Sequence, residues 1–205
     1  MYVPPHFRED DPALLMEVMQ RHSFATLVSN LDGAPFASHL PLKVSQDDAG
    51  VRIDGHFARA NPHWQALQAD PNALVIFQGP HTYISPTLYQ SSNRVPTWNY
   101  IAVHATGRVR VDHSADAKLN ILQQLIAQYE PGYRSQFDAI DGALRDGLLN
   151  AIVAFELTVD KLEGKFKLGQ NRLTDNKPEM QRWHEQGGEN ERELAHWMQR
   201  LGHWS

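Results

Sequence analysis

The sequence predicts an α+β protein, mainly β, in which short antiparallel strands form a small barrel or a strongly curled sheet with helices packed outside. Segments with the period-2 alternation of strands fill most of the chain before Val111. A single helical segment, after Pro62, falls between Val51 and Val111. This argues against a doubly wound fold, which needs helices between most of its strands.

Composition places the chain among folded globular proteins. Its 205 residues can bury a real core, and we expect one domain over residues 1–205 with C-terminal helices from about residue 178. No apolar run approaches the ~20 residues that cross a bilayer. The N-terminus lacks the features of a secretory signal, so we expect a cytoplasmic protein without membrane contact. The absence of cysteine excludes disulfides, thiolate catalysis and cysteine-based metal sites.

The elements follow from local signals along the chain. Asp10 or Asp11 before Pro12 predicts the start of a first helix. Asp32-Gly33, between two alternating segments, is a strong hairpin signal. The predicted strands cover residues 25–29, 36–42, 51–58, 73–77, 82–85, 98–111 and 151–159. The later predicted helices cover residues 62–69, 114–129 and the charged remainder from about residue 178.

Prolines and glycines mark the expected interruptions. Pro41 and Pro96 predict strand ends, bulges or edges, since proline cannot donate to a strand ladder. The segment around Gly79-Pro80 is interpreted as a tight turn between two strands. A Gly/Pro break is expected after the helix that ends near Tyr129. The segment 165–172 is interpreted as a loop after the last strand, for which an ordinary surface loop is the default explanation.

The junction from Gly55 to Trp64 predicts an anion site. An alternating strand runs directly into a helix start, where Asn61 is a good N-cap and Pro62 suits the first helical position. The free N–H groups of that first turn and the guanidinium of Arg59 would suit a phosphate. The alternative is an ordinary strand-to-helix turn with a solvated arginine.

Aromatic and histidine side chains give weaker signals. Trp98 and Tyr100 share a strand face at period two and could wall a planar ligand, or else pack against a helix or a subunit interface. The eleven histidines are scattered and form no recognised metal-ligand spacing. We therefore expect no metal site, with a haem or zinc site assembled in three dimensions as the alternative. No nucleophile elbow, P-loop or dinucleotide fingerprint is present, and no catalytic residue is assigned.

Several motifs in a fixed order resemble those of one family. They are Met1-Tyr2-Val3-Pro4, Ser38-His39-Leu40-Pro41-Leu42, the segment Gly55 to Pro62, the segment Phe77 to Ser85, the segment Val95 to Tyr100, and Lys167-Leu168-Gly169-Gln170-Asn171-Arg172. Together they resemble the PaiB-type, FMN-binding negative transcriptional regulators, from Met1 to about Arg172. The resemblance implies an FMN-binding split β-barrel with peripheral helices and a homodimer with FMN at the subunit interface. Gly169 stands where the family often has serine.

The resemblance also implies where FMN would bind. Arg59 and Asn61, with the turn after Pro62, would hold the flavin phosphate. His39 and His56, expected on neighbouring strands, would lie along the ribityl chain or the ring edge. The candidates that complete the site from the partner subunit are Trp98, Asn99, Gln170, Asn171 and Arg172.

Three functions remain open at this point. The family implies transcriptional repression, but a net charge of -5 and the lack of a helix-turn-helix signature predict at most weak, strongly salt-dependent DNA binding, unless a dimer doubles a basic face around Lys165, Lys167 and Arg172. A flavin-dependent oxidoreductase, of the reductase or oxidase type, is the second possibility. A haem-binding or haem-degrading role is the third.

Overall fold

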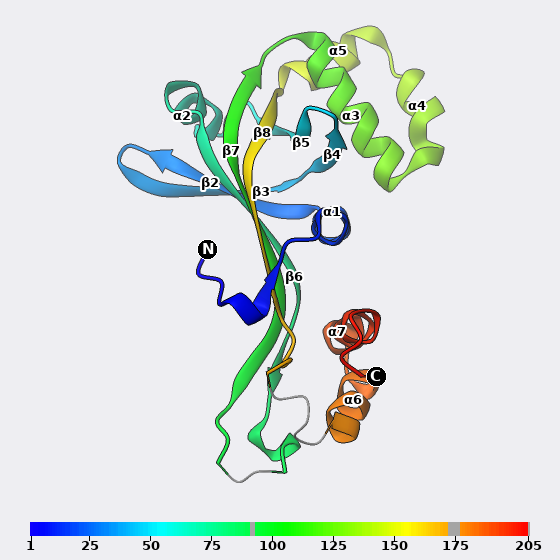
Figure 1. The fold of residues 1–205 in the computed structure, drawn as a ribbon. Coiled ribbons are helices and arrows are strands. Elements are labelled where there is room, and N and C mark those ends of the chain that lie inside the picture. Colours follow the sequence, from blue (N-terminus) through cyan, green and yellow to red (C-terminus); the bar gives the residue numbers. More distant parts are fainter. Residues whose placement is uncertain (91–92, 172–176, 205) are drawn as a thin grey trace. The chain divides into compact units, whose positions relative to one another are not determined.

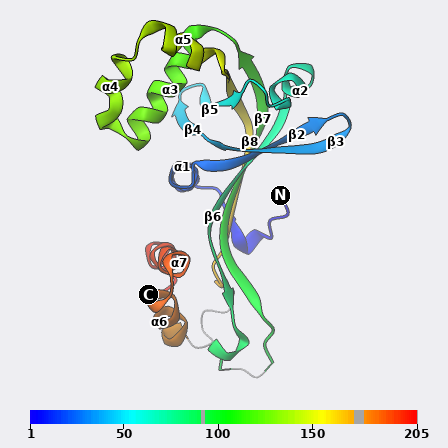
Figure 2. The same cartoon turned by 180° about the vertical axis from the view of Figure 1, so that it is seen from behind.

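The computed structural model describes residues 1–90, 93–171 and 177–204 (Figures 1 and 2). Its helices are α1 (Pro12–Arg21), α2 (His63–Ala69), α3 (Ala115–Tyr129), α4 (Arg134–Asp138), α5 (Gly142–Asn150), α6 (Lys177–Gln186) and α7 (Glu189–Arg200), with 3-10 turns η1 (Pro5–Phe7), η2 (Pro86–Leu88) and η3 (Pro131–Tyr133). Its strands are β1 (Arg8–Glu9), β2 (Phe24–Leu31), β3 (Ala34–Pro41), β4 (Lys43–Asp47), β5 (Gly50–Ala58), β6 (Asn72–Ile84), β7 (Thr97–Asp112) and β8 (Ile152–Lys167). None of the helices in these ranges has the length and apolarity that crossing a bilayer requires.

The strands form one sheet in the order β3-β2-β6-β7-β8-β5-β4, with β1 paired to β8. The registers of β2 with β3, β2 with β6, β4 with β5 and β5 with β8 are all antiparallel. The predicted α+β class is therefore confirmed. The expectation of short strands is wrong for β6, β7 and β8, which have 13, 16 and 16 residues.

The chain divides into two compact units. Unit 1 contains residues 1–15, 78–103 and 163–205, and unit 2 contains residues 16–77 and 104–162. The long strands β6, β7 and β8 each contribute residues to both units. The single domain over residues 1–205 stays a prediction.

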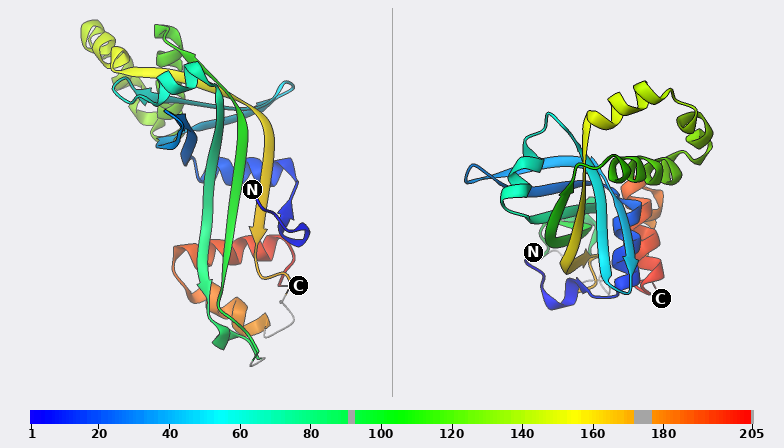
Figure 3. Two further views of the ribbon diagram at one scale, coloured as in Figure 1. Left: turned by 90° about the vertical axis from the view of Figure 1, so that its left-hand side faces the viewer. Right: turned by 90° about the horizontal axis from the view of Figure 1, so that it is seen from above.

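Unit 2 contains the predicted hairpin, which joins β2 and β3. Asp32 and Gly33 have φ values of 53° and 80°, and Leu31 pairs with Ala34, as in a two-residue turn with both central residues left-handed. The inward residues of its strands, among them Leu27, Phe57 and Val75, are fully buried. Figure 3 shows α3, α4 and α5 as one helical group, and these helices contact one another. The sequence predicted α3 correctly but gave only a break where α4 and α5 lie.

Unit 1 combines the remaining ends of β6, β7 and β8 with the C-terminal helices. Helices α6 and α7 contact each other along the chain's last segment (Figure 1), which confirms the helical C-terminal region. An apolar cluster joins them to the end of β6: Ile84, Leu88, Tyr89 and Met180 are buried, and Trp183 and Trp204 pack against them. Trp197 of α7 is fully buried and meets Phe166 of β8 edge to face.

Two expected interruptions are wrong. Residues 78–81 do not form a turn, because β6 runs continuously through Gly79 and Pro80. A Cβ at position 79 would lie 3.1 Å from atoms of Ile101 on β7, so glycine permits this close approach. Pairing of β6 with β2 covers only Leu74–Ile76, so Pro80 lies beyond that ladder and interrupts none of its bonds. Likewise, Lys165 and Lys167 belong to β8 and not to a loop.

Candidate functional site

The predicted anion junction in unit 2 is built around a buried histidine. His63 is fully buried; its Nε2 lies 2.8 Å from Ser29 Oγ, and its Nδ1 lies 2.8 Å from Ser38 Oγ. Asn61 Nδ2 donates to Ser38 Oγ at 2.9 Å, and Asn61 Oδ1 accepts from the His63 backbone N–H at 3.0 Å. Burial lowers the pKa of His63, which favours the neutral ring. The polar groups of Asn61 and His63 therefore satisfy one another.

This arrangement corrects the predicted helix start. Pro62, and not Asn61, occupies the N-cap position of α2, which has only seven residues. Asn61 instead forms an Asx turn one residue earlier, because its side chain reaches the backbone N–H two positions on. One of the backbone donors expected to face an anion is thus already bonded.

Arg59 is exposed and partly engaged. Its Nε donates to the carbonyl of Asn150 at 2.5 Å, and its Nη2 donates to the carbonyl of Ile152 at 3.2 Å. Its own carbonyl accepts from Trp64 Nε1 at 3.0 Å. These bonds tether the side chain, and its guanidinium carries further N–H groups on Nη1 and Nη2.

The two predicted histidines are separated in the sheet order. His39 lies on β3 and His56 on β5; these strands are not hydrogen-bonded to each other, but they contact each other, and the role of the two histidines stays a prediction. His39 is exposed, and its Nδ1 lies 3.0 Å from Thr26 Oγ1. His56 Nδ1 is buried without a hydrogen-bond partner among the described residues. Burial lowers the pKa of His56.

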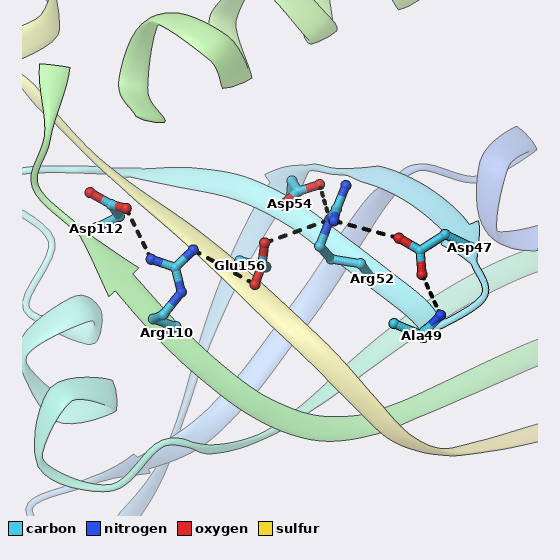
Figure 4. A network of polar contacts seen from close by, with 7 residues as sticks. All are labelled: Asp47, Ala49, Arg52, Asp54, Arg110, Asp112 and Glu156. Carbon is cyan, nitrogen blue, oxygen red and sulfur yellow. Dashed lines mark hydrogen bonds and ion pairs between the residues drawn. The ribbon is translucent and has the colours of Figure 1, made fainter. Parts of the chain in front are cut away.

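A charged network elsewhere in unit 2 is also internally paired (Figure 4). Arg52 contacts Asp54 at 3.2 Å and Glu156 at 3.6 Å. Arg110 contacts Asp112 at 3.0 Å and Glu156 at 3.7 Å. Burial raises the pKa of Asp54, partly offset by Arg52. These charges border a cavity of about 90 Å³ and compensate one another.

Unit 1 contains a larger cavity with an unsatisfied polar atom. Its volume is about 240 Å³, and it is lined by His6, Phe7, Tyr89, Thr97, Asn99, Lys167, Gly169 and Asn171. Asn99 is only 2% exposed, and its Oδ1 is buried without a hydrogen-bond partner among the described residues. Lys167 Nζ donates to Thr97 Oγ1 at 2.5 Å and to the carbonyl of Trp98 at 2.8 Å. A buried unpaired acceptor costs about 1–3 kcal/mol, so it is the group here most in need of a ligand donor.

The turn after β8 shapes one wall of this cavity. Gly169 has φ +73°, a left-handed conformation that favours glycine over the serine common in the resembling family. Gln170 closes the turn, since its Oε1 accepts from Leu168 N at 2.8 Å and its Nε2 donates to the Phe166 carbonyl at 2.6 Å. Gln170 therefore has a structural role in this turn, while Asn171 lines the cavity.

Trp98 lies on the other face of β7. Thr97 and Asn99 line the cavity, so the alternation of the strand turns Trp98 away from it. Trp98 is 51% exposed and packs near His81 and Tyr83, with ring centroids 6.4 Å and 6.1 Å away. On the same strand, Tyr100 lies 5.3 Å from Lys165 Nζ.

The structure thus divides the predicted site residues into two groups. Asn99 and Asn171 line the cavity of unit 1, while Arg59 and Asn61 share the junction of unit 2. Arg172 lies outside the described residues. Sequence reasoning missed Phe7, Thr97 and Lys167 as lining residues. The alternation of β7 could have found Thr97, because it lies two residues before Asn99. In the described ranges, no group of three or more His, Asp or Glu side chains is arranged to hold a metal ion.

Comparisons with known proteins agree with this architecture. Residues 1–161 match the family described as "Putative FMN-binding domain". The chain is 37% identical over 174 residues to "Protease synthase and sporulation protein PAI 2" of Bacillus subtilis (strain 168), covering 84% of this chain and 83% of that protein. It is 30% identical over 154 residues to "Uncharacterized protein YKL070W" of Saccharomyces cerevisiae, covering 63% of this chain and 90% of that protein.

Two solved structures share the fold. "Structure of the Flavocytochrome Anf3 from Azotobacter vinelandii" has a TM-score of 0.64 at 14% identity, covering 80% of this chain and 72% of that chain. "Structure of the FAD and Heme binding protein from Mycobacterium smegmatis" has a TM-score of 0.63 at 20% identity, covering 78% and 73%. The predicted split-barrel fold is confirmed. With the family match over residues 1–161 and the PAI 2 relative, the chain belongs to the PaiB-type FMN-binding family.

Proposed function

We propose that this protein, as a member of an FMN-binding family, holds the ring and ribityl chain of FMN in the Asn99 cavity of unit 1. The buried Oδ1 of Asn99, which has no hydrogen-bond partner among the described residues, is the observation that carries this proposal. The donor set fits a flavin, because the ring and ribityl chain offer N–H and O–H donors to Asn99 and carbonyl acceptors to Lys167 and Asn171. When bound, FMN supplies electron-transfer chemistry, and the protein orients it.

We propose the Arg59 junction of unit 2 as a separate anion site, for which the phosphate of FMN is the test ligand. Arg59→Ala should weaken FMN binding by about one to two orders of magnitude, since a charge-assisted hydrogen bond contributes roughly 1.5–3 kcal/mol. Riboflavin lacks the phosphate and should bind both proteins equally. Flavin fluorescence titrations measure both ligands, with Arg134→Ala as the control that removes an exposed arginine paired to Asp138 on α4. Unchanged FMN binding would remove the phosphate site from this junction, and equal losses for both flavins would mean that Arg59 acts through its bonds to the carbonyls of Asn150 and Ile152.

A homodimer completes this proposal. The cavity of about 240 Å³ lies below the ~300–1,000 Å³ of sites that enclose small-molecule ligands, so it holds only part of a flavin. A second copy supplies the missing cover, and the exposed Trp98 on the opposite face of β7 is a further surface that a homodimer can bury. Light scattering should give the mass of a dimer at micromolar concentration with FMN, and a monomer there would contradict it.

The proposed cellular role is regulation, as a PaiB-type negative transcriptional regulator. Its support is the 37% identity to a protein named for protease synthesis and sporulation. With a net charge of -5, direct DNA binding should be weak and steeply salt-dependent. A gel shift that shows sequence-specific nanomolar binding at physiological salt would overturn this expectation and make the protein a direct repressor.

A flavin-dependent oxidoreductase or haem-binding protein is the second candidate. It is favoured by the fold shared with proteins named as a flavocytochrome and as an FAD- and haem-binding protein. Turnover of NADH or NADPH with added FMN tests the enzyme. Titration with haem, followed by its Soret absorption, tests the haem-binding alternative.

A further inference from the structure

The C-terminal helices bring a second buried histidine to the cavity wall. His184 on α6 is fully buried. Its Nδ1 lies 2.8 Å from the carbonyl oxygen of Met180, and its Nε2 lies 3.5 Å from Asn99 Nδ2. Asn99 in turn lines the cavity. A hydrogen-bonded path therefore leads from the backbone of α6 to the cavity through two side chains.

The direction of this path follows from the donors available. A carbonyl oxygen only accepts, so His184 Nδ1 must carry the proton that it shares with Met180. In the neutral ring, Nε2 is then an acceptor. Asn99 can satisfy Nε2 only with its amide nitrogen, which leaves Oδ1 as the amide atom without a partner in the part of the chain that the structure describes. Gly169 lies beside this amide, since a Cβ there would make ordinary van der Waals contact with both amide atoms at 3.7 Å.

We propose that His184 is a positioning residue, which holds the Asn99 amide so that Oδ1 offers the cavity an acceptor for a hydrogen-bond donor of the ligand. The identity of that ligand as a flavin rests on the proposed function. On a flavin the donor is either the ring N3–H or a ribityl O–H. The helices α6 and α7 thereby take part in ligand selection, although they follow the residues that match the family.

Protonation of His184 would change which group of the Asn99 amide faces the cavity. A charged ring donates from both nitrogens, so the Asn99 amide must rotate to accept from Nε2 and would present its N–H groups to the cavity. Burial lowers the pKa of His184, partly offset by the Met180 carbonyl and by Glu191 of α7. The rings of Trp183 and Trp204 also pack on His184. The acceptor is therefore kept at neutral pH and lost under acid conditions.

The tautomer is tested first, without any ligand. Nitrogen-15 NMR of the histidine side chains at pH 7.5 should show His184 protonated at Nδ1. A ring protonated at Nε2 would overturn the proposal whether or not the protein binds FMN. This measurement therefore separates failure of the inference from failure of the proposed function.

Variants then test the effect on binding. His184→Leu removes the acceptor and should weaken FMN by about three- to tenfold, the loss expected for one hydrogen bond whose geometry is no longer fixed. His184→Gln places a carbonyl oxygen near the position of Nε2 and should restore most of the affinity. Leu194→Ala, on α7, is the matched control for lost packing, because Leu194 is fully buried and apolar. Equal losses in His184→Leu, His184→Gln and Leu194→Ala would reduce His184 to a packing role and overturn the proposal.

Ligand analogues and pH identify the donor. Lumiflavin keeps N3–H and lacks the ribityl chain, so a His184→Leu loss that persists with lumiflavin assigns the ring, and a loss confined to FMN and riboflavin assigns a hydroxyl. In the wild type, affinity should fall as the pH decreases through the folded-state pKa of His184, which burial holds below 6.5, and His184→Gln should flatten that profile. A profile unchanged in His184→Gln would contradict the positioning role.

Discussion

The junction of unit 2 and the cavity of unit 1 use similar residues in opposite ways. Each contains a buried histidine and an asparagine linked by hydrogen bonds. At the junction, His63 has two serine partners, and Asn61 uses both ends of its amide. At the cavity, His184 contacts the amide nitrogen of the lining residue Asn99, whose Oδ1 has no partner among the described residues. The first set of polar groups is complete without a ligand, and the second is not.

This difference distinguishes buried polar groups that hold the fold together from buried polar groups that can bind a ligand. A buried polar group that is fully bonded stabilises one conformation and leaves nothing to a ligand. An unpaired buried acceptor costs folding free energy, and a ligand donor can recover it on binding. Substitutions at the junction should therefore change stability, whereas substitutions at the cavity should change affinity.

The largest expected effect is at the junction. Ser38→Ala removes the partner of both His63 Nδ1 and Asn61 Nδ2, so the free energy of unfolding should fall by about 2–3 kcal/mol. Urea denaturation measures it. Ser29→Ala removes only the partner of His63 Nε2 at a partly exposed position and should cost less. An unchanged denaturation midpoint in Ser38→Ala would show that the junction is not held by this network.

The next largest effect is expected at the cavity, where a substitution should change flavin affinity more than stability. Asn99→Leu should weaken FMN and riboflavin alike by about tenfold, because the lost acceptor does not face the phosphate. The free energy of unfolding should change by less than about 1 kcal/mol, because two effects oppose each other. The variant removes the Asn99 Oδ1 acceptor, which stabilises the protein, but it also removes the partner of His184 Nε2, whose bond is a long one of 3.5 Å. Fluorescence titration and urea denaturation measure both quantities. A large stability loss with intact affinity would erase the contrast with the junction.

The smallest effect is the response to acid. Burial lowers the pKa values of His63 and His184 in the folded state. Below pH 6.5 the unfolded chain therefore binds more protons than the folded chain, and stability falls as the pH decreases. Both histidines contribute to this loss, which begins as the pH falls toward the unfolded-state pKa of histidine near 6.5. The serine hydroxyls beside His63 can accept hydrogen bonds from its charged ring, whereas the Asn99 amide must rotate before it can accept from a charged His184. The His184→Gln variant should therefore flatten the pH dependence of stability more than His63→Gln does. A stability profile that is flatter in His63→Gln than in His184→Gln would contradict this prediction.

Local signals predicted the elements that depend on short-range chemistry. Asp32-Gly33 correctly predicted a hairpin turn. Ser114 is the N-cap of α3, where its Oγ accepts a hydrogen bond from the backbone N–H of Ala117 at 3.2 Å. The failures have tertiary causes. Gly79 and Pro80 look like a turn, but β6 runs through them, and the absence of a side chain at Gly79 permits the close approach of Ile101 on β7. Helices α4 and α5 lie in a weakly patterned segment and are supported by contacts with α3.

The site was predictable only in part for the same reason. Asn99 and Asn171 could be named from their motifs, and they do line one cavity. Whether an amide is left unpaired depends on a partner far along the chain, as His184 shows for Asn99. The opposite outcome for Asn61 depends on Ser38. No spacing rule within one segment distinguishes these two asparagines.

The cavity wall joins residues from inside and outside the family match. Phe7 and Asn99 fall within residues 1–161, whereas Lys167, Gly169 and Asn171 follow them. Divergence after residue 161 can therefore retune the ligand while the inherited strands stay the same. Because we propose that FMN binds in this cavity, exchanging residues 162–205 between relatives should give a chimera with the scaffold of one parent and the flavin preference of the other.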